Sequence, residues 1–200
     1  PQPLKEEYLL TSDLEPTNEW YAIAKITGVK ACQAIRKQFD KDYVSLMPTN
    51  LYGTYDNFDL NTSHVLPAMM RKFHEAVANN HAPVTLWGSG TPLREFLFVD
   101  DMAEAVVFAL ENKLPDYLYN IGTGVDLTIK QLAETIQKIT GHQGEIIWDA
   151  TKPDGTPRKL MDISKMHDLG WQHKIDLEEG IQMTYDWFLE HVKEIKEVKM

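Results

Sequence analysis

Tyr21-Ala-Ile-Ala-Lys25 is the stretch around which we interpret this chain. On a helix, a tyrosine and a lysine four residues apart project from the same face, with Cβ atoms about 5–6 Å apart. A cation beside a phenol stabilises the phenolate, which makes the phenol a better proton donor near neutral pH. A tyrosine at a helix edge beside a solvated lysine is the structural alternative. A β-prone run and Pro48-Thr-Asn-Leu-Tyr-Gly53 come next, and this order favours a reactive pair.

Helical and β-prone segments alternate from this stretch onward. The sequence predicts a helix that Thr17 or Asn18 can cap and that includes Tyr21–Phe39. It predicts further helices over His64–Asn79, Met102–Glu111, Thr128–Ile139 and Leu177–Val192, with a short one from Ser164. It predicts strands over Tyr43–Met47, Val84–Trp87, Arg94–Val99, Leu118–Ile121 and Ile146–Trp148. It assigns loops to Thr49–Asn61 and Thr151–Arg158. This alternation is typical of the α/β class.

Capping residues support several of these boundaries. Thr128 and Gln131 have the spacing of a capping box, in which each side chain bonds the other residue's backbone N–H. Asp100 or Asp101 is expected to cap the helix that follows, and Ser164 the short helix, because short polar side chains accept from free N–H groups.

Composition excludes several classes of function. The chain has 200 residues, of which 43% are hydrophobic and 25% charged, with a net charge of −10. A general nucleic-acid binder needs a basic face, so nucleic acid is not an expected partner. No apolar run is long enough for a membrane span, and the single cysteine, Cys32, fits a reducing compartment. We therefore expect a cytoplasmic protein, and no histidine or cysteine spacing predicts a metal site.

Four further residues are candidates for ligand binding. Lys72 and Arg94 could hold a diphosphate, Arg94 through two parallel hydrogen bonds, although each alone could be a solvated charge. Trp87 ends a strand and could be a core residue or a stacking platform. His64, at the start of a helix, could cap that helix or transfer a proton, since imidazole titrates near neutral pH.

Two glycine pairs look like parts of a dinucleotide-binding motif. Gly88-Ser-Gly90 and Gly122-Thr-Gly124 both follow a predicted strand, but each lacks the third glycine of that motif. We expect both to be turns.

Seven segments together carry a resemblance to a known family. They are Leu14–Lys25, Met47–Gly53, Asp56–Phe58, Ser63–Pro67, Leu86–Phe96, Val99–Met102 and Lys152–Lys159. With them the chain resembles the extended short-chain dehydrogenase/reductase family. Within that family it is most similar to the branch that converts GDP-4-keto-6-deoxy-D-mannose to GDP-L-fucose with NADP(H).

The resemblance implies a role for each candidate. Tyr21 would donate a proton to the C4 oxygen during reduction, and Lys25 would hold the nicotinamide ribose. His64 would be the acid and base of epimerisation at C3 and C5, and would also lie near the cofactor. The residues implied at the nicotinamide end of NADP are Pro48, Thr49, Asn50 and Leu51. Those implied around a GDP-sugar substrate are Lys72, Trp87, Arg94 and Lys159.

The resemblance also implies how the chain is organised. Family members begin with a glycine-rich βαβ unit, so the chain resembles their C-terminal two-thirds and is expected to be inactive alone. The expected fold is the C-terminal part of a Rossmann-like doubly wound parallel sheet plus a smaller α/β substrate-binding lobe. Residues 1–82 would belong to a partial NADP-binding domain. Residues 83–200 would form mainly the substrate lobe, with returns to the sheet around 94–123.

Three alternatives or additions stay open at this stage. The helices Tyr21–Phe39 and His64–Asn79 are expected to form a homodimer, as the resemblance implies. Another extended short-chain epimerase or dehydratase, acting on a UDP- or dTDP-sugar, is the enzymatic alternative. A non-catalytic module that binds a nucleotide-sugar is the alternative from a different class.

Overall fold

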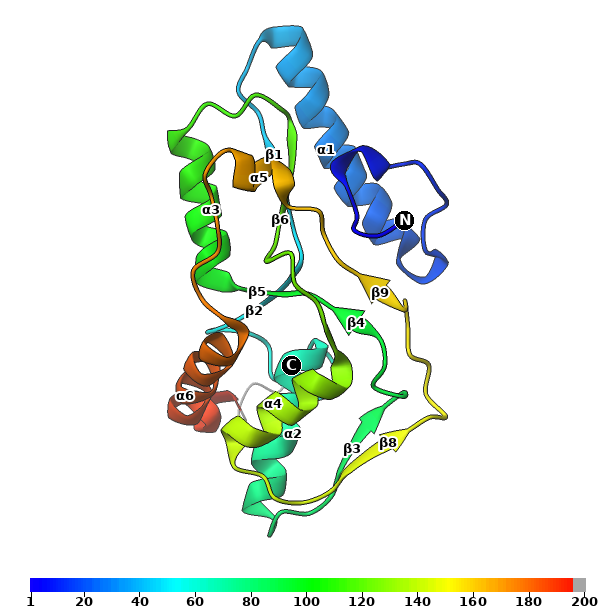
Figure 1. The fold of residues 1–200 in the computed structure, drawn as a ribbon, viewed down its shortest axis with the longest axis vertical. Helices are drawn as coiled ribbons and strands as arrows, with labels where there is room; N and C mark the ends of the chain where they lie inside the picture. Colours follow the sequence, from blue (N-terminus) through cyan, green and yellow to red (C-terminus); the bar gives the residue numbers. More distant parts are fainter. Residues whose placement is uncertain (196–200) are drawn as a thin grey trace.

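The computed structural model describes residues 1–195 and has a mixed α/β architecture (Figure 1). The helices are α1 (Glu19–Phe39), α2 (Val65–Ala78), α3 (Val99–Glu111), α4 (Ile129–Thr140), α5 (Ser164–Asp168) and α6 (Leu177–Ile195), with 3-10 turns at Glu6–Tyr8 and Pro16–Asn18. The strands are β1 (Ser45–Pro48), β2 (Asn50–Tyr52), β3 (Val84–Trp87), β4 (Leu93–Arg94), β5 (Phe96–Phe98), β6 (Leu118–Ile121), β7 (Leu127–Thr128), β8 (Ile146–Asp149) and β9 (Arg158–Lys159). The predicted α/β class is confirmed.

Parallel pairing dominates the described strands. β1 pairs with β6, β2 with β5, and β3 with β8, each in parallel register. The small sheet β7-β4-β9 joins one antiparallel and one parallel pair. Each parallel pair brings together segments that are far apart in the sequence, as crossover connections require.

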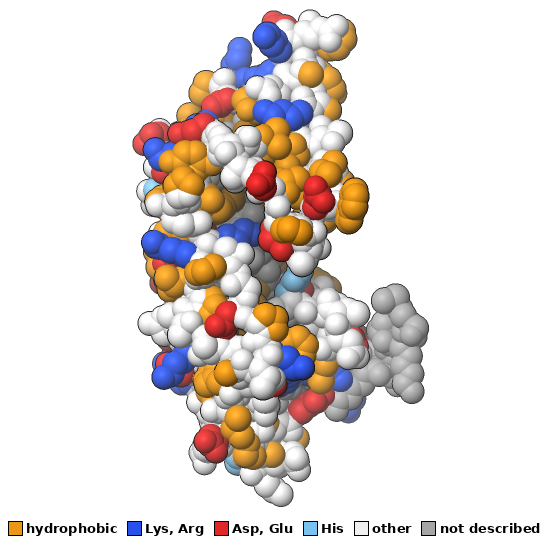
Figure 2. All heavy atoms as spheres, turned by 90° about the vertical axis from the view of Figure 1, so that its right-hand side faces the viewer, with side chains coloured by type: hydrophobic (Ala, Val, Ile, Leu, Met, Phe, Trp, Pro, Cys, Tyr) orange, Lys and Arg blue, Asp and Glu red, His pale blue; other side chains and the backbone are white. Residues whose placement is uncertain are grey.

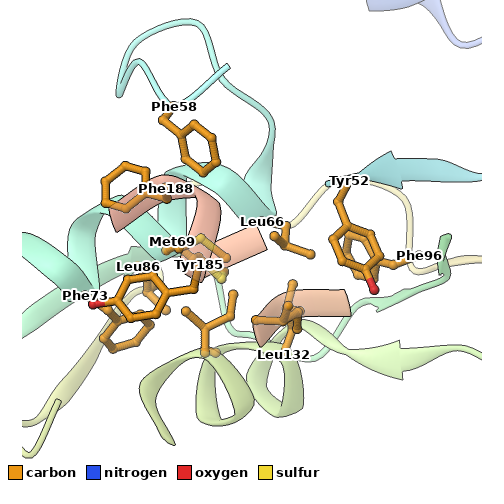
Figure 3. Packing of buried hydrophobic residues seen from close by; sticks show 14 of the residues in the cluster. Tyr52, Phe58, Leu66, Met69, Phe73, Leu86, Phe96, Leu132, Tyr185 and Phe188 are labelled. Carbon is orange, nitrogen blue, oxygen red and sulfur yellow. The ribbon is translucent and has the colours of Figure 1, made fainter. Parts of the chain in front are cut away.

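β5 separates two hydrophobic clusters. Phe96 and Phe98 belong to the larger cluster, whereas Leu97 belongs to the smaller one, because successive side chains of a strand point to opposite faces. The larger cluster gathers residues of β2, β3, α2, α4 and α6, among them Leu66, Phe73, Leu132 and Phe188 (Figure 3). α2 therefore shares its core with elements that follow residue 83.

α1 packs very differently from α2. None of its residues is buried, and Trp20, Tyr21 and Ile23 are exposed. Arg36 ties the helix to the rest by donating to the Leu114 carbonyl oxygen at 2.6 Å. Figure 2 views the molecule from the right-hand side of Figure 1 and shows hydrophobic side chains gathered on the upper half of that face. No helix in the described residues is both long enough and apolar enough to span a membrane.

Several boundary predictions are corrected by the structure. The strand expected over Arg94–Val99 is interrupted at Glu95, and β2 lies inside the segment expected to be a loop. Asp101 does not cap α3, because its buried carboxylate accepts from the Lys174 and Ile175 N–H groups at 2.9 and 3.1 Å. Ser164 is helical from the start and donates to Asp162 instead of capping.

The capping box at the start of α4 is confirmed. The Thr128 side chain accepts from the Gln131 N–H at 3.0 Å, and the Thr128 N–H donates to the Gln131 side chain at 2.9 Å. β3, β6 and the start of β8 lie where the sequence predicts them.

A buried carboxylate explains the interruption between β4 and β5. Glu95 is completely buried. Its Oε1 accepts from the N–H groups of Thr123 and Gly124 at 2.7 and 2.8 Å, and its Oε2 accepts from Met161 at 2.9 Å. A Cβ on Gly122 would lie 2.3 Å from Oε1, so only glycine fits there. The Glu95 side chain thus joins its own segment to two distant ones.

Glu95→Gln should lower the free energy of unfolding by about 2–4 kcal/mol, because the amide would point a donor at buried N–H groups. Urea denaturation monitored by circular dichroism measures the loss. The matched control is Glu134→Gln on the exposed face of α4, which should change stability by less than about 0.5 kcal/mol. Equal stability of the two variants would contradict this role for Glu95.

Candidate functional site

A cleft of about 240 Å³ lies at the end of β3. Its lining includes three residues that the sequence singled out, Asn50, Trp87 and Arg94, together with Val65, which adjoins His64. The remaining lining residues are Gly90, Pro92, Ile129, Pro153 and Asp154. The structure thus brings predicted cofactor-side and substrate-side residues to one cavity.

The cations of the site are not neutralised within the described residues. Arg94 and Lys159 occupy paired positions on β4 and β9, and within residues 1–195 neither forms a salt bridge. Burial lowers the pKa of Arg94, and burial followed by the nearby Arg94 charge lowers the pKa of Lys159, with Glu95 acting in the opposite direction. Two adjacent cations that form no salt bridge within residues 1–195 make a site suited to a phosphate group.

Lys72 lies on α2, and its ammonium donates to the Thr85 carbonyl oxygen at 3.2 Å. Partial burial lowers the pKa of this lysine. Lys72 is not one of the residues that line the cleft, although it contacts the strand that leads to Trp87. Trp87 is 68% exposed, so it is not a core residue and its ring is accessible for stacking.

Asp154 is a cleft residue that sequence reasoning missed. Its carboxylate accepts from the N–H and hydroxyl of Ser89 at 2.6 and 2.7 Å, and these bonds lower the pKa of Asp154. Asp154 belongs to a segment expected to be an irregular loop, and its distance in sequence from Ser89 concealed the contact. The Pro-Asp-Gly run at 153–155 was the available signal, since such runs place a side chain at a turn.

Tyr21 and Lys25 lie together on the exposed surface of α1. The Lys25 ammonium is 5.5 Å from the centre of the Tyr21 ring, as the four-residue spacing predicts. The Tyr21 side chain is two-thirds exposed, at 66%, and neither residue lines the cleft. In Figure 1 the first turns of α1, which carry this pair, are at the end of the helix nearer to β9.

His64 is exposed at the N-cap position of α2, and its side chain makes no capping hydrogen bond. The capping alternative is therefore wrong for this residue. Burial raises the pKa of Asp56, while the Asn57 N–H and the nearby His64 act in the opposite direction. The exposed His64 side chain thus lies close to the Asp56 carboxyl group.

Residues 48–51 run from the end of β1 through Thr49 into β2, and we call this segment the 48–51 connection. The Thr49 hydroxyl and the Asn50 amide both donate to the Glu95 carbonyl oxygen, at 3.2 and 2.6 Å. Pro48 is part of β1, and Leu51 packs against the smaller hydrophobic cluster. Glu95 therefore fixes this connection through its backbone while its side chain fixes the 122–124 turn.

The glycine pairs are turns, as expected. The Thr123 and Gly124 N–H groups already bind Glu95. At the start of α4, the N–H groups of Ile129 and Lys130 bind the carbonyl oxygens of Pro92 and Gly90. Side-chain cations, and not these N–H groups, are thus the donors available to an anion here. In the described residues no three potential ligands cluster as a metal site would require.

Comparisons with known proteins identify the family of the chain. The family model described as NAD dependent epimerase/dehydratase family matches residues 1–122. "Putative GDP-L-fucose synthase 2" of Arabidopsis thaliana is 58% identical over 197 residues, covering 98% of this chain and 60% of that protein. "GDP-L-fucose synthase" of Escherichia coli K12 is 55% identical over 199 residues, covering 95% and 62%. The chain thus spans about 60% of the length of these relatives.

Solved structures give the same result. A GDP-L-fucose synthetase from Naegleria fowleri bound to NADP superposes with a TM-score of 0.86 at 28% identity, covering 96% of this chain and 62% of that one. A GDP-6-OMe-4-keto-L-xylo-heptose reductase from C. jejuni superposes with a TM-score of 0.87 at 36% identity, covering 96% and 66%. The sequence resemblance and the Rossmann-like fold are confirmed, and the chain belongs to the NAD dependent epimerase/dehydratase family.

Proposed function

We propose that this chain supplies the substrate-binding site and the proton-transfer residues of an NADP(H)-dependent epimerase/reductase that converts GDP-4-keto-6-deoxy-D-mannose to GDP-L-fucose. The observation that carries the proposal is the convergence of Asn50, Trp87 and Arg94 on one cleft, with Lys159 beside Arg94. The names of the most similar relatives support the choice of substrate.

The cleft offers complementary chemistry for a nucleoside diphosphate sugar. Arg94 can bind two phosphate oxygens at once, and Lys159 adds a second positive charge. The exposed ring of Trp87 provides a surface on which a base can stack. Lys72 reinforces the positive potential from α2 without lining the cleft.

The cofactor would be held at its nicotinamide end by Lys25 and the 48–51 connection. The fit rests on two observations. The Lys25 ammonium and the Tyr21 hydroxyl have no hydrogen-bond partner within residues 1–195, and the Thr49 hydroxyl and the Asn50 side-chain amide are held by the Glu95 carbonyl oxygen. When bound, NADPH supplies hydride for reduction of the C4 ketone.

The proton transfers fall to two residues. The Tyr21 phenol donates its proton to the C4 oxygen, and Lys25 stabilises the resulting phenolate. His64 removes and returns protons at C3 and C5, which the C4 ketone makes acidic. Its exposed imidazole, which makes no capping hydrogen bond and lies near Asp56, suits that role.

The assembly and location remain proposals. An apolar groove of about 530 Å³ on α1, lined by Leu10, Leu14, Ile23 and Ile26 among others, supports association of two copies through α1. α2 presents fewer apolar side chains to such an interface, because Leu66, Met70 and Phe73 are buried within the chain.

The lone cysteine supports a cytoplasmic location. The division at residue 82 stays a prediction, and the larger hydrophobic cluster contains residues from both sides of it, such as Phe73 and Phe188.

GDP should bind residues 1–200 measurably by isothermal titration calorimetry, and NADPH more weakly. GDP depends on cleft residues that are present, whereas the cofactor residues present reach only its nicotinamide end. Arg94→Met should weaken GDP binding about tenfold or more, since it removes a charged hydrogen-bonding group. Lys113→Met, a surface control, should leave it unchanged. Tighter binding of NADPH than of GDP would refute this assignment, and UDP binding as tightly as GDP would favour another sugar nucleotide.

A chimera can test the proton-transfer roles, with residues 1–200 replacing the matching part of the Escherichia coli relative. Tyr21→Phe should abolish NADPH oxidation but spare deuterium exchange at C3 and C5, because only reduction needs the phenol proton. His64→Asn should abolish the exchange. NMR in deuterated water separates the two steps. The reverse pattern would show that the roles are wrongly assigned.

A further inference from the structure

The loop at residues 150–157 is attached to the turn after β3 by a contact that the proposed reaction does not use. The Ser89 N–H donates to Asp154 Oδ1 at 2.6 Å, and the Ser89 hydroxyl donates to Oδ2 at 2.7 Å. Hydrogen bonds to a carboxylate are stronger than neutral ones. One residue thus engages both oxygens of Asp154.

The turn itself is shaped for this contact. Gly88 has φ +79°, and a Cβ there would lie 2.3 Å from Asp154 Oδ1. Gly90 has φ +75°, and its Cβ would lie 2.7 Å from the Trp148 ring. Both glycines allow a backbone conformation and a close approach that any larger residue would prevent. The Gly88-Ser-Gly90 turn is therefore built to meet β8 and the loop that follows it.

The loop is held at two further points. The Lys152 ammonium lies 5.6 Å from the centre of the Trp87 ring, within the range of a cation–π contact. At the other end, the Leu93 N–H donates to the Pro157 carbonyl oxygen at 2.9 Å, immediately before β9. The loop thus runs between Trp87 and Lys159, two residues proposed to bind the ligand.

The position of the loop gives the contact a functional consequence. Pro153 and Asp154 line the cleft together with Arg94 and Trp87, so movement of the loop would change the shape of the cleft. A carboxylate that touched a diphosphate directly would repel it. Both oxygens of Asp154 instead accept hydrogen bonds from Ser89, so its contribution to ligand binding is structural.

We propose that the Ser89–Asp154 contact is a positioning device that holds loop 150–157 as a wall of the nucleotide-sugar cleft. Asp154 and Ser89 are then positioning residues, which act on the ligand through Trp87 and Lys159. The identity of the ligand rests on the proposed function; the closure of the loop does not.

Hydrogen exchange followed by mass spectrometry tests the closure without any ligand. Asp154→Ala and Ser89→Ala should raise exchange about tenfold in peptides that cover 86–92 and 149–158, because a charged hydrogen bond is lost. Asp154→Asn can keep both contacts, because its oxygen can accept from the Ser89 N–H and its amide can donate to the Ser89 hydroxyl. The same peptides of this variant should therefore exchange as slowly as those of the wild type. Ser164→Ala removes a similar hydroxyl–carboxylate bond to Asp162 and should leave these peptides unchanged.

Calorimetry with GDP tests the consequence. Asp154→Ala should weaken GDP binding about tenfold, since only the closed fraction binds, while Asp154→Asn should bind as the wild type does. Unchanged exchange in both alanine variants would overturn the proposal. Equal loss of GDP affinity in the asparagine and alanine variants, with exchange unchanged in asparagine, would overturn it in favour of direct contact. If the wild type fails to bind GDP, the proposed function fails, and the exchange result alone decides the closure.

Discussion

The buried carboxylate of Glu95 is the interaction on which the rest of the site depends. It interrupts the strand between β4 and β5 and binds three backbone N–H groups from the 122–124 turn and from Met161. A buried charge is stable only when its hydrogen-bonding capacity is used, and here distant segments satisfy it. Its own carbonyl oxygen accepts from Thr49 and Asn50. One residue therefore sets the relative positions of β2, β4, β6 and the segment after β9.

This arrangement explains why residues from distant parts of the sequence line one small cleft. Arg94 precedes Glu95 and takes its position from β4, between β7 and β9. Asn50 is bonded directly to Glu95, and Lys159 is paired with Arg94 across the strands. Trp87, at the end of β3, has no such link to Glu95. The neighbouring Gly88–Gly90 turn is bonded to loop 150–157, and Lys152 of that loop contacts the Trp87 ring. The site thus has a rigid side and a side held by surface contacts.

Local signals in the sequence were enough to predict much of this fold. The Thr128–Gln131 capping box, β3 and the four-residue spacing of Tyr21 and Lys25 depend on neighbours within one turn or strand, and all are found. Features that depend on distant partners were not predictable in this way. β2 forms because β5 pairs with it, and Asp101 leaves the cap of α3 because the 174–175 backbone needs acceptors. Asp154 was missed for the same reason.

The proposed site requires that nucleotide binds the cleft beside Trp87 and not the exposed surface of α1. Two indole groups can decide this, because Trp87 lines the cleft and Trp20 adjoins Tyr21 on α1. The measurement is a titration of ¹⁵N-labelled protein with GDP, with the indole N–H signals assigned by Trp87→Phe and Trp20→Phe. If nucleotide binds the cleft, the Trp87 signal should shift progressively to saturation while the Trp20 signal stays in place. A shift of Trp20 with no change at Trp87 would contradict it.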